Sequence, residues 1–528
     1  MKKIFTLATL LLSAALTAGA TDYTAPIRVT VGGESVDAGQ TTISVDDTND
    51  TEWSLTLRNF TFSGMPVGNI SLTGIPVTKC GTVSTFAQHI ADAAITNGDD
   101  ADVDSWMGPE LGKMPIDIKG RVAKNDIQAV LLINMCHAGL GTIRVEVGER
   151  ADEVTQLPNS GFERFHTAKS GSTTSDEPDG WHSFMSCQGS LASAVKGTVH
   201  TAIVTDGLRE GTTGTRALKV YSSAILGISA NGTVTTGRLN AGSMTAANTD
   251  NHSLLDFTVT DTDAAGDPFY AVLTTRPDSI TAWVKYTVGK RSSKNQSNVY
   301  ATISSAITDG TYYQDPNPSG ANYTNVVAKA SNTEVAATED WQRVTIPFDY
   351  ATYEANGASA RALLVTMSTC SVPGGGSTTS SDPDILLVDD VALVYNTALT
   401  ALSYDGQAVS GFSADTDEYE IESATAFDKE KLAWTLPSQA STVDIVEVKS
   451  DDAHSIVFLT VKGDDLSAHT YTLSFTDTTA AGIDAIDAPS QEPVSAVYDL
   501  SGRRVSQTAQ GNVYIVRTQS GKAYKMVR

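Results

Sequence analysis

Short runs in which apolar and polar residues alternate recur along almost the whole chain, and they limit what it can fold into. Runs such as IRVTV (27–31), WSLTLRNF (53–60) and TYTLSF (470–475) place every second side chain on the same face of an extended strand. Thr and Val often occupy the alternating positions, and Gly or Asp residues separate the runs. The pattern predicts an all-β protein, and 528 residues suffice for three or four domains.

Residues 1–20 have the features of a secretory signal peptide. Lys2 and Lys3 precede an apolar run, and Ala18 to Ala20 form a small-residue cleavage site that ends at Ala20. The run is shorter than the roughly 20 apolar residues of a membrane helix, and no cysteine follows it to accept a lipid. We therefore expect a secreted mature protein, at the cell surface or in the extracellular space.

The formal net charge of −25 argues against nucleic acid and anionic lipid as partners, because both require clustered Lys and Arg. A solvated acidic surface is the simplest interpretation of this charge, and cation binding is the alternative. Four cysteines in an exported chain permit two disulfides. The domain limits suggest the pairs Cys80–Cys136 and Cys187–Cys370.

Residues 21–150 contain seven short alternating runs with Gly or Asp turns between them, which predicts an antiparallel barrel or sandwich. The segments DTEWSLTLRNF, GMPVGNI and SWMGPELGKMPIDIKGRV, in that order, resemble the calycin-like domain of secreted Bacteroidetes proteins. The resemblance implies a lipocalin-type barrel. We expect its interior to be filled by its own side chains rather than by a ligand.

Residues 159–396 form the largest unit, and their strands and long polar loops suit a two-sheet jelly roll. Near the end of this unit, DILLVDDVALVYN (384–396) places Asp389 and Asp390 inside an apolar strand. Neighbouring side chains of a strand point to opposite faces, so one of the two carboxylates needs a hydrogen-bond partner, a counter-charge or a metal. The alternative is an edge strand in which water or backbone amides satisfy both.

Four segments of this unit resemble the candidate carbohydrate metabolism domain of Bacteroidetes, and more distantly the jelly-roll carbohydrate-binding modules: NSGFERF, PDGWHSF, GTRALKVYS and LLVDDVALVY. In the latter, a structural calcium is held by the Glu of the first motif and an Asp of the last. The resemblance thus implies a calcium site at Glu163 and Asp389, and carbonyls near Asn159 would complete it. Calcium suits such an oxygen-rich set, because it takes six to eight oxygen ligands.

A loop in the same unit, GTYYQDPNPSGANYTN (310–325), combines aromatic and polar residues. Sugars stack their C–H faces on aromatic rings and hydrogen-bond through their hydroxyls. The loop therefore supplies candidate carbohydrate-binding residues, namely Tyr312, Tyr313, Asp315, Asn317 and Tyr323. The alternative is an ordinary surface hairpin whose tyrosines anchor it to the sheet.

The last two units are smaller. Residues 397–478 alternate regularly and predict an immunoglobulin-like sandwich that resembles the cadherin-like repeats of Bacteroidetes surface proteins. Residues 490–528 are basic, and VYDLSGRRV, GNVYIVR and GKAYKMVR resemble the C-terminal sorting domain of type IX secretion substrates. The resemblance implies the outer-membrane secretion machinery as a partner. The alternative is a terminal β unit without an export role.

Familiar catalytic motifs are absent from the sequence: it has no HExxH, P-loop, dinucleotide fingerprint or GxSxG elbow. The eight histidines are scattered, and His182 is more typical of a loop or core residue than of a base. Glycoside hydrolysis needs only two carboxylates, which 61 acidic residues supply in many combinations. We expect a non-catalytic protein that binds polysaccharide or assists its processing; a glycoside hydrolase and an adhesive surface protein are the alternatives.

Overall fold

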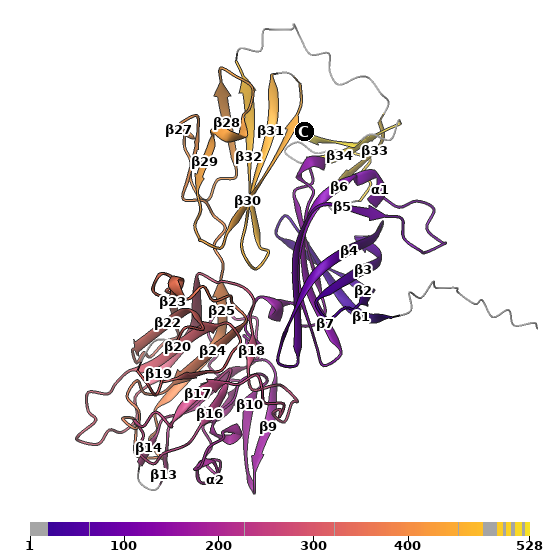
Figure 1. Cartoon of the computed structure of the whole chain (residues 1–528). Coiled ribbons are helices and arrows are strands. Elements are labelled where there is room, and N and C mark those ends of the chain that lie inside the picture. Colours follow the sequence, from indigo (N-terminus) through magenta and orange to yellow (C-terminus); the bar gives the residue numbers. More distant parts are fainter. Residues whose placement is uncertain are drawn as a thin grey trace, which may run out of the picture.

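The computed structural model describes residues 19–62, 64–225, 228–320, 323–451, 453–478, 494–499, 503–507, 513–519 and 523–527. Strands make up most of it, and they form a barrel, two sandwiches and a small C-terminal sheet (Figure 1). The predicted all-β fold class is therefore confirmed. Nearly all of the proposed signal peptide and the linker at 479–493 lie outside the described residues.

The first eight strands close into an antiparallel barrel. They are β1 (Ala20–Val31), β2 (Glu34–Asp46), β3 (Glu52–Phe62), β4 (Met65–Cys80), β5 (Val83–Thr96), β6 (Lys113–Ala123), β7 (Asp126–Asn134) and β8 (Thr142–Val147), with the short helices α1 (Gly108–Leu111), η1 (Cys136–Ala138) and η2 (Ala151–Val154). Pairs such as Ile27 with Val147 join β1 to β8 and close the ring. Large aliphatic side chains, including Ile70, Met114 and Ile116, are fully buried in its core. The barrel is thus packed with its own side chains.

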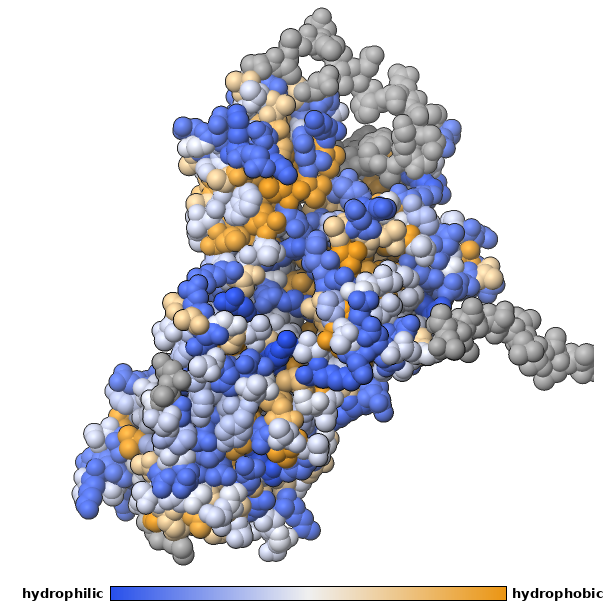
Figure 2. Space-filling view, in the orientation of Figure 1, coloured by the Kyte–Doolittle hydropathy of each residue, from blue (hydrophilic) through white to orange (hydrophobic). Residues whose placement is uncertain are grey.

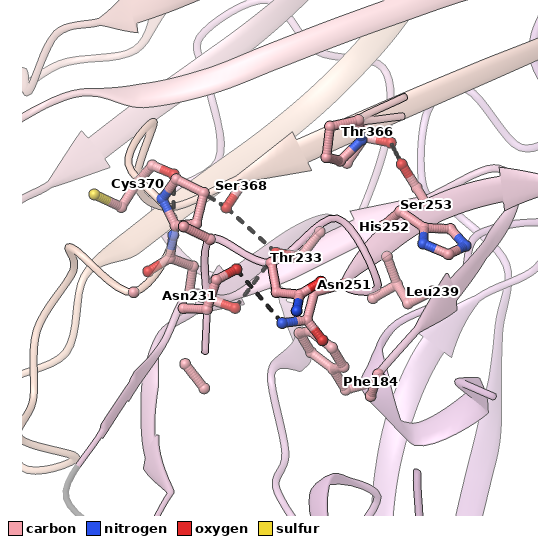
Figure 3. Close-up of a pocket in the computed structure, with 18 of the residues that line it drawn as sticks. Phe184, Asn231, Thr233, Leu239, Asn251, His252, Ser253, Thr366, Ser368 and Cys370 are labelled. Carbon is pink, nitrogen blue, oxygen red and sulfur yellow. Dashed lines mark hydrogen bonds between the residues drawn. The ribbon is translucent and has the colours of Figure 1, made fainter. Parts of the chain in front are cut away.

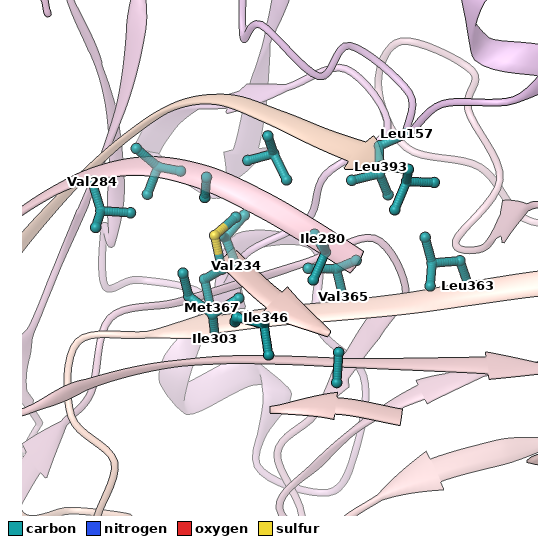
Figure 4. Packing of buried hydrophobic residues seen from close by; sticks show 14 of the residues in the cluster. Leu157, Val234, Ile280, Val284, Ile303, Ile346, Leu363, Val365, Met367 and Leu393 are labelled. Atoms are coloured by element: carbon teal, nitrogen blue, oxygen red, sulfur yellow. The ribbon is translucent and has the colours of Figure 1, made fainter. Parts of the chain in front are cut away.

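The central unit is a sandwich of two antiparallel five-stranded sheets. One has the order β11 (Thr201–Val204), β12 (Ala217–Tyr221), β25 (Ile385–Val394), β19 (Ser279–Thr287), β23 (Gln342–Pro347). The other has the order β15 (Thr233–Thr235), β24 (Ala362–Ser368), β20 (Ala301–Thr308), β22 (Val326–Val335), and β18 (Ala271–Val272) also pairs with β24. Side chains from both sheets, among them Val284 and Leu393 from the first and Ile303 and Met367 from the second, form one core between them (Figure 4).

Shorter elements surround this sandwich. They are the hairpin β9 (Phe165–Ser170) with β10 (Thr173–Pro178), the hairpin β13 (Ser223–Ile225) with β14 (Ile228–Ala230), the sheet of β16 (Arg238–Asn240), β17 (His252–Leu255) and β21 (Tyr313–Asp315), and the helices η3 (Phe184–Ser186), α2 (Ala192–Val195) and η4 (Ala351–Asn356). Several of them lie at one end of the sandwich, at the bottom of Figure 1. They build the walls of the cavity described below.

The third unit is a smaller sandwich. One sheet contains β27 (Gln407–Ala408), β26 (Ala401–Tyr404) and β29 (Leu432–Thr435); the other contains β28 (Glu418–Ser423), β32 (Ala468–Asp477), β31 (His454–Lys462) and β30 (Thr442–Lys449), and η5 (Lys429–Lys431) precedes β29. After it, β33 (Val494–Asp499), β34 (Val513–Thr518) and β35 (Ala523–Val527) form an antiparallel sheet. Among the described residues, no helix combines the length and apolar character needed to cross a membrane.

All four cysteines are free and buried, so the disulfides suggested from the sequence, Cys80–Cys136 and Cys187–Cys370, are wrong. Each thiol of the barrel faces another unit instead. Cys80 belongs to an apolar cluster with Tyr270 of the central sandwich, and Cys136 Sγ lies 3.8 Å from Thr460 Oγ1 of the third unit. Burial raises the pKa of Cys80 to about 12 and that of Cys136 to about 11, which keeps both as unreactive thiols.

One residue of the third unit joins all three large units. The Asp464 carboxylate pairs with Lys119 of the barrel, and its Oδ2 accepts a hydrogen bond of 2.7 Å from the backbone N–H of Arg276 in the central sandwich. Figure 1 shows the barrel beside both sandwiches, as these contacts require. Charged hydrogen bonds of this kind fix relative orientation, because both partners are largely removed from water.

We expect Asp464→Ala to loosen this arrangement without unfolding any unit. Each lost charged hydrogen bond contributes roughly 1.5–3 kcal/mol, so small-angle scattering should report a larger radius of gyration. The matched control is Asp405→Ala, which removes a more exposed pair with Lys431 (3.2 Å) on the third unit alone. If both variants scatter as the wild type does, Asp464 does not hold the units together.

Candidate functional site

A cavity of about 450 Å³ opens at the end of the central sandwich (Figure 3). Its floor is the outer face of the second sheet, contributed by β20, β22 and β24. Its walls come from β14, from the segment that joins β16 to β17, and from Phe184 and α2. This size and construction suit a small-molecule or oligosaccharide site.

Hydroxyl groups cover the floor because alternate residues of each strand point away from the core. Thr366, Ser304 and Ser331 are direct neighbours across β24, β20 and β22. Thr233, Ser368 and Thr302 form a second row, across β15, β24 and β20. All six residues line the cavity. Several of these hydroxyls already donate to protein oxygens, as Thr302 does to the Asn332 carbonyl (3.1 Å) and Ser368 to the Cys370 carbonyl (3.3 Å), so they offer a ligand hydrogen-bond acceptors.

Two buried polar atoms in the wall have no hydrogen-bond partner among the described residues, namely Ser229 Oγ and Asn231 Oδ1. The other end of the Asn231 amide is fixed, since its Nδ2 donates to the carbonyl oxygens of Cys370 (3.1 Å) and Val372 (2.9 Å). A buried acceptor without a hydrogen bond lowers the stability of the folded protein. Both residues line the cavity, but these two oxygens are themselves removed from solvent and lie beside Gly376, which is not among the lining residues.

The rest of the lining is largely apolar. Phe184, Leu191 and Leu239 contribute to the inner wall, and Ile228 (40 % exposed) and Met244 (48 % exposed) lie at the surface. Figure 2 shows hydrophobic residues gathered at the same lower end of the molecule. Exposed apolar side chains around a cavity are typical of a binding site rather than of a solvated surface.

The described lining of the cavity contains few acidic side chains. Among the described lining residues, Asp315 is the one carboxylate, and its Oδ2 lies 3.5 Å from Lys329 Nζ. His252 also lines the cavity, but its Nδ1 is hydrogen-bonded to the Thr249 carbonyl oxygen at 2.8 Å. Glycoside hydrolysis requires two carboxyl groups on either side of the scissile bond. The lining can therefore bind a polyhydroxylated ligand, but it does not present a catalytic pair.

The structure places the predicted carbohydrate-binding residues of the aromatic loop in different environments. Asp315 lines the cavity, as described above, whereas Tyr313 is fully buried and packs edge-on against Tyr323 at 5.1 Å. Tyr312 is 48 % exposed, and its hydroxyl donates to Gln314 Oε1 at 2.8 Å. Asn317 Oδ1 accepts from the backbone N–H of Ser319 at 3.0 Å. Tyr313 cannot offer its ring to a sugar, so at this position the anchoring alternative holds.

The aspartate pair has a geometric explanation that the sequence did not reveal. Asp390 has a positive φ of 43° at a β-bulge in β25, so the inward-outward alternation shifts by one residue there. Asp389 is thereby fully buried, and its Oδ2 accepts no hydrogen bond from the described residues. The Arg209 guanidinium, from a loop far away in sequence, pairs with Asp390 (Nε to Oδ2, 2.7 Å). The Arg209 Nε also lies 4.0 Å from Asp389 Oδ2.

Burial, together with the charges of Asp390 and Glu163, raises the pKa of Asp389 to about 6. The first motif does lie beside the last strand, because the Val391 N–H donates to the Ser160 carbonyl oxygen at 2.9 Å. Glu163 already accepts from the backbone N–H groups of Thr215 (2.9 Å) and Arg216 (3.0 Å). The Thr215 hydroxyl also donates to Glu163 Oε2 at 2.8 Å. The calcium site at Glu163 and Asp389 stays a prediction.

Asn159, the third predicted calcium residue, has a structural role in the first motif, beside β25. It is 5 % exposed and adopts a positive φ of 48°. Its side chain closes the turn of the first motif, because Nδ2 donates to the Arg164 carbonyl (2.7 Å) and Oδ1 accepts from the Arg164 N–H (3.1 Å). The Asn159 carbonyl accepts from Phe162 N–H at 2.9 Å. One lone pair of that carbonyl remains for a further partner.

His182 is a core residue, as its sequence context suggested. It is fully buried, its Nδ1 lies 2.8 Å from the Gly237 carbonyl oxygen, and its Nε2 lies 3.3 Å from Asp263 Oδ2. His166 continues this network, with Nδ1 3.1 Å from Asp179 Oδ1. Within the described part of the chain, no group of three His, Cys, Asp or Glu residues is arranged to hold a metal. The contacts of His182 and His166 link segments within the central sandwich.

Comparison with known proteins identifies the first unit. Residues 20–148 match the family of calycin-like β-barrel domains. This family accounts for the closed eight-stranded barrel and covers that part of the chain alone. A search of curated proteins found no match.

Two solved structures resemble parts of the chain, and both are described as candidate glycoside hydrolases. The one from Bacteroides vulgatus is 18 % identical and has a TM-score of 0.31, and the match covers 46 % of this chain and 97 % of that one. The one from Bacteroides thetaiotaomicron is 15 % identical and also has a TM-score of 0.31, with 58 % and 87 % covered. Similarity at this level carries no argument about function.

Proposed function

We propose that the chain is an exported, non-catalytic multidomain protein whose central sandwich binds carbohydrate at the cell surface. The observation that carries the proposal is the composition of the cavity. Its floor presents two rows of Ser and Thr hydroxyls. Apolar side chains border it, as the C–H faces of a sugar require.

A glycan-array screen of the mature chain, residues 21–528, tests the proposal. We expect retention of at least one class of oligosaccharide, and the same screen with a chelator shows whether calcium is required. If no glycan is retained under either condition, an adhesive or structural role replaces carbohydrate binding.

Hydrolase activity is the enzymatic alternative, and one observation speaks against it. The described lining contains a single carboxylate, Asp315, whereas an acid and a base or nucleophile are both needed. We expect no release of reducing sugar from any glycan that the array identifies. Release that disappears in Asp315→Asn would instead make this residue catalytic.

Export remains part of the proposal and concerns the two ends of the chain. Deletion of residues 490–528 should leave the other units folded, because they make their own cores, yet retain the protein in the periplasm. Fractionation with surface proteolysis checks this expectation. Surface display of the truncated chain at the wild-type level would remove the sorting role of the C-terminal strands.

A further inference from the structure

We infer that the outer face of the first sheet of the central sandwich binds a polyuronate, a linear polysaccharide with a carboxylate on each sugar unit. The inference rests on the proposed carbohydrate-binding function and adds a second surface to it, on the sheet opposite the cavity. The surface is marked by a local reversal of charge, by cations without carboxylate partners and by aliphatic residues between them.

Two segments of this unit contain no Asp or Glu, although the chain has 61 acidic residues. These segments are residues 211–249 and 279–308. Their basic residues are Arg216, Lys219, Arg238, Lys285, Lys290, Arg291 and Lys294. The first segment contributes β12 and the second β19, and β25 lies between these strands. The fold thus brings two acid-free segments together on one sheet of an acidic protein.

Basic side chains share the outer face of this sheet. Lys219 of β12 and Lys285 of β19 lie on either side of Leu387 of β25. Both lysines are half-buried, whereas the residues before and after each of them are buried in the core between the sheets. The lysines therefore point away from that core. Arg343 of the neighbouring strand β23 is exposed and lies opposite Trp283.

These three cations have no carboxylate partner among the described residues. Other basic residues nearby are paired, as Arg209 is with Asp390 and Arg291 with Asp384, but Lys219, Lys285 and Arg343 form no ion pair. The net charge of −25 opposes their effect at long range. At physiological ionic strength, charges beyond about 8 Å are largely screened, so the potential at this face is set by its own cations.

Aliphatic side chains occupy positions between the charges. Leu387 separates the two lysines, and Ile385 lies in the next row, between Tyr221 and Thr287. Both aliphatic residues are half-buried. The C–H faces of pyranose rings can lie on such a surface while carboxylates reach the amines on either side.

The same face suits nucleic acid poorly. Lys219 Nζ lies 5.1 Å from the centre of the Tyr221 ring, and the Arg209 guanidinium lies 5.1 Å from that of Trp283. Both rings are thus partly covered, whereas bases stack on open aromatic faces. The lysine-bearing strands are two strand spacings apart, roughly 10 Å. A charge on each sugar unit matches this spacing better than a phosphate about every 3.4 Å along a strand.

Calorimetric titration of the mature chain with an oligogalacturonide and with its methyl-esterified form tests the inference. The two ligands share a backbone and differ in the charge of each unit. We expect the free acid to bind at least tenfold more tightly. This preference should shrink in about 1 M salt, where the screening length falls to about 3 Å.

The double variant Lys219→Gln, Lys285→Gln should bind the free acid at least tenfold more weakly than the wild type and the ester unchanged. Glutamine keeps a long polar side chain at both half-buried positions, so the melting curve should stay near that of the wild type. Lys169→Gln is the matched control, because Lys169 is an exposed lysine on the β9–β10 hairpin of the same unit. It should bind the acid as the wild type does.

Equal affinity for acid and ester, or an unchanged affinity of the double variant for the acid, would overturn the inference. Tighter binding of a single-stranded oligonucleotide than of the oligogalacturonide would do the same. The carbohydrate-binding function would still stand if the array retains another glycan. If the array and the titrations find no glycan ligand, the proposed function fails together with the inference.

Discussion

Replacement of Trp181 by alanine should lower the free energy of unfolding of the central sandwich by about 3–5 kcal/mol. The Trp181 ring is fully buried and packs against Phe162 at 5.3 Å. Its Nε1–H donates to the Pro158 carbonyl oxygen at 2.8 Å, so the substitution also leaves this carbonyl without its partner. Both contacts tie the PDGWHSF segment to the first motif of the domain. Calorimetry of the mature chain should show one transition shifted to much lower temperature.

Tyr312→Ala is the matched control for this experiment. Tyr312 is an aromatic residue of the same sandwich, but it is 48 % exposed, and substitutions at such surface sites usually change stability by less than about 0.5 kcal/mol. A shift of similar size in both variants would show that burial of Trp181 is not the cause.

Substitution of Asp389 by asparagine should stabilise the calcium-free domain at neutral pH by roughly 1–3 kcal/mol, because it removes a buried charge with an unsatisfied oxygen. The amide retains an acceptor for the Asp390 N–H, which donates to Asp389 Oδ1 at 2.9 Å. In the wild type, the folded-state pKa of Asp389, about 6, lies above the ordinary aspartate value of 3.8, so the folded state binds more protons between these values. Stability should therefore fall as pH rises through this window and then level off.

If Glu163 and Asp389 hold calcium, the ion should offset the loss of stability that the buried Asp389 charge causes. Melting curves in chelator and in millimolar calcium should then differ for the wild type and coincide for Asp389→Asn. Asp390→Asn, which affects the carboxylate paired with Arg209, is the matched variant and should retain the calcium response. Identical wild-type curves in both conditions would contradict the calcium site, whereas a missing pH response would contradict the buried charge.

Alternation in the sequence was sufficient to predict the fold class, because burial of one face of each strand imposes period two on its residues. The same pattern contained the hydroxyl rows: Thr302 with Ser304, and Thr366 with Ser368, are outward positions of strands with apolar inward residues. What the sequence could not show was which strands are neighbours. Thr366 meets Ser304 only because β24 pairs with β20.

Long-range contacts explain the remaining differences. The counter-charge for Asp390 is Arg209, which lies in a loop without a motif, and the bulge that buries Asp389 depends on pairing with β19. The composition of the aromatic loop predicted Tyr313 as a sugar-binding residue, yet its ring is buried in an apolar cluster. Composition could identify residues capable of binding sugars, but burial decided which of them are accessible.

The most direct test of the carbohydrate site is a calorimetric titration of three forms of the mature chain with the glycan that the array selects. Ser304→Trp places an indole at the centre of the cavity floor, and Thr345→Trp places the same side chain at an exposed position of β23 in the other sheet. Our account predicts at least a tenfold loss of affinity for Ser304→Trp and none for Thr345→Trp. Binding by folded Ser304→Trp with the wild-type affinity would show that the cavity is not the site.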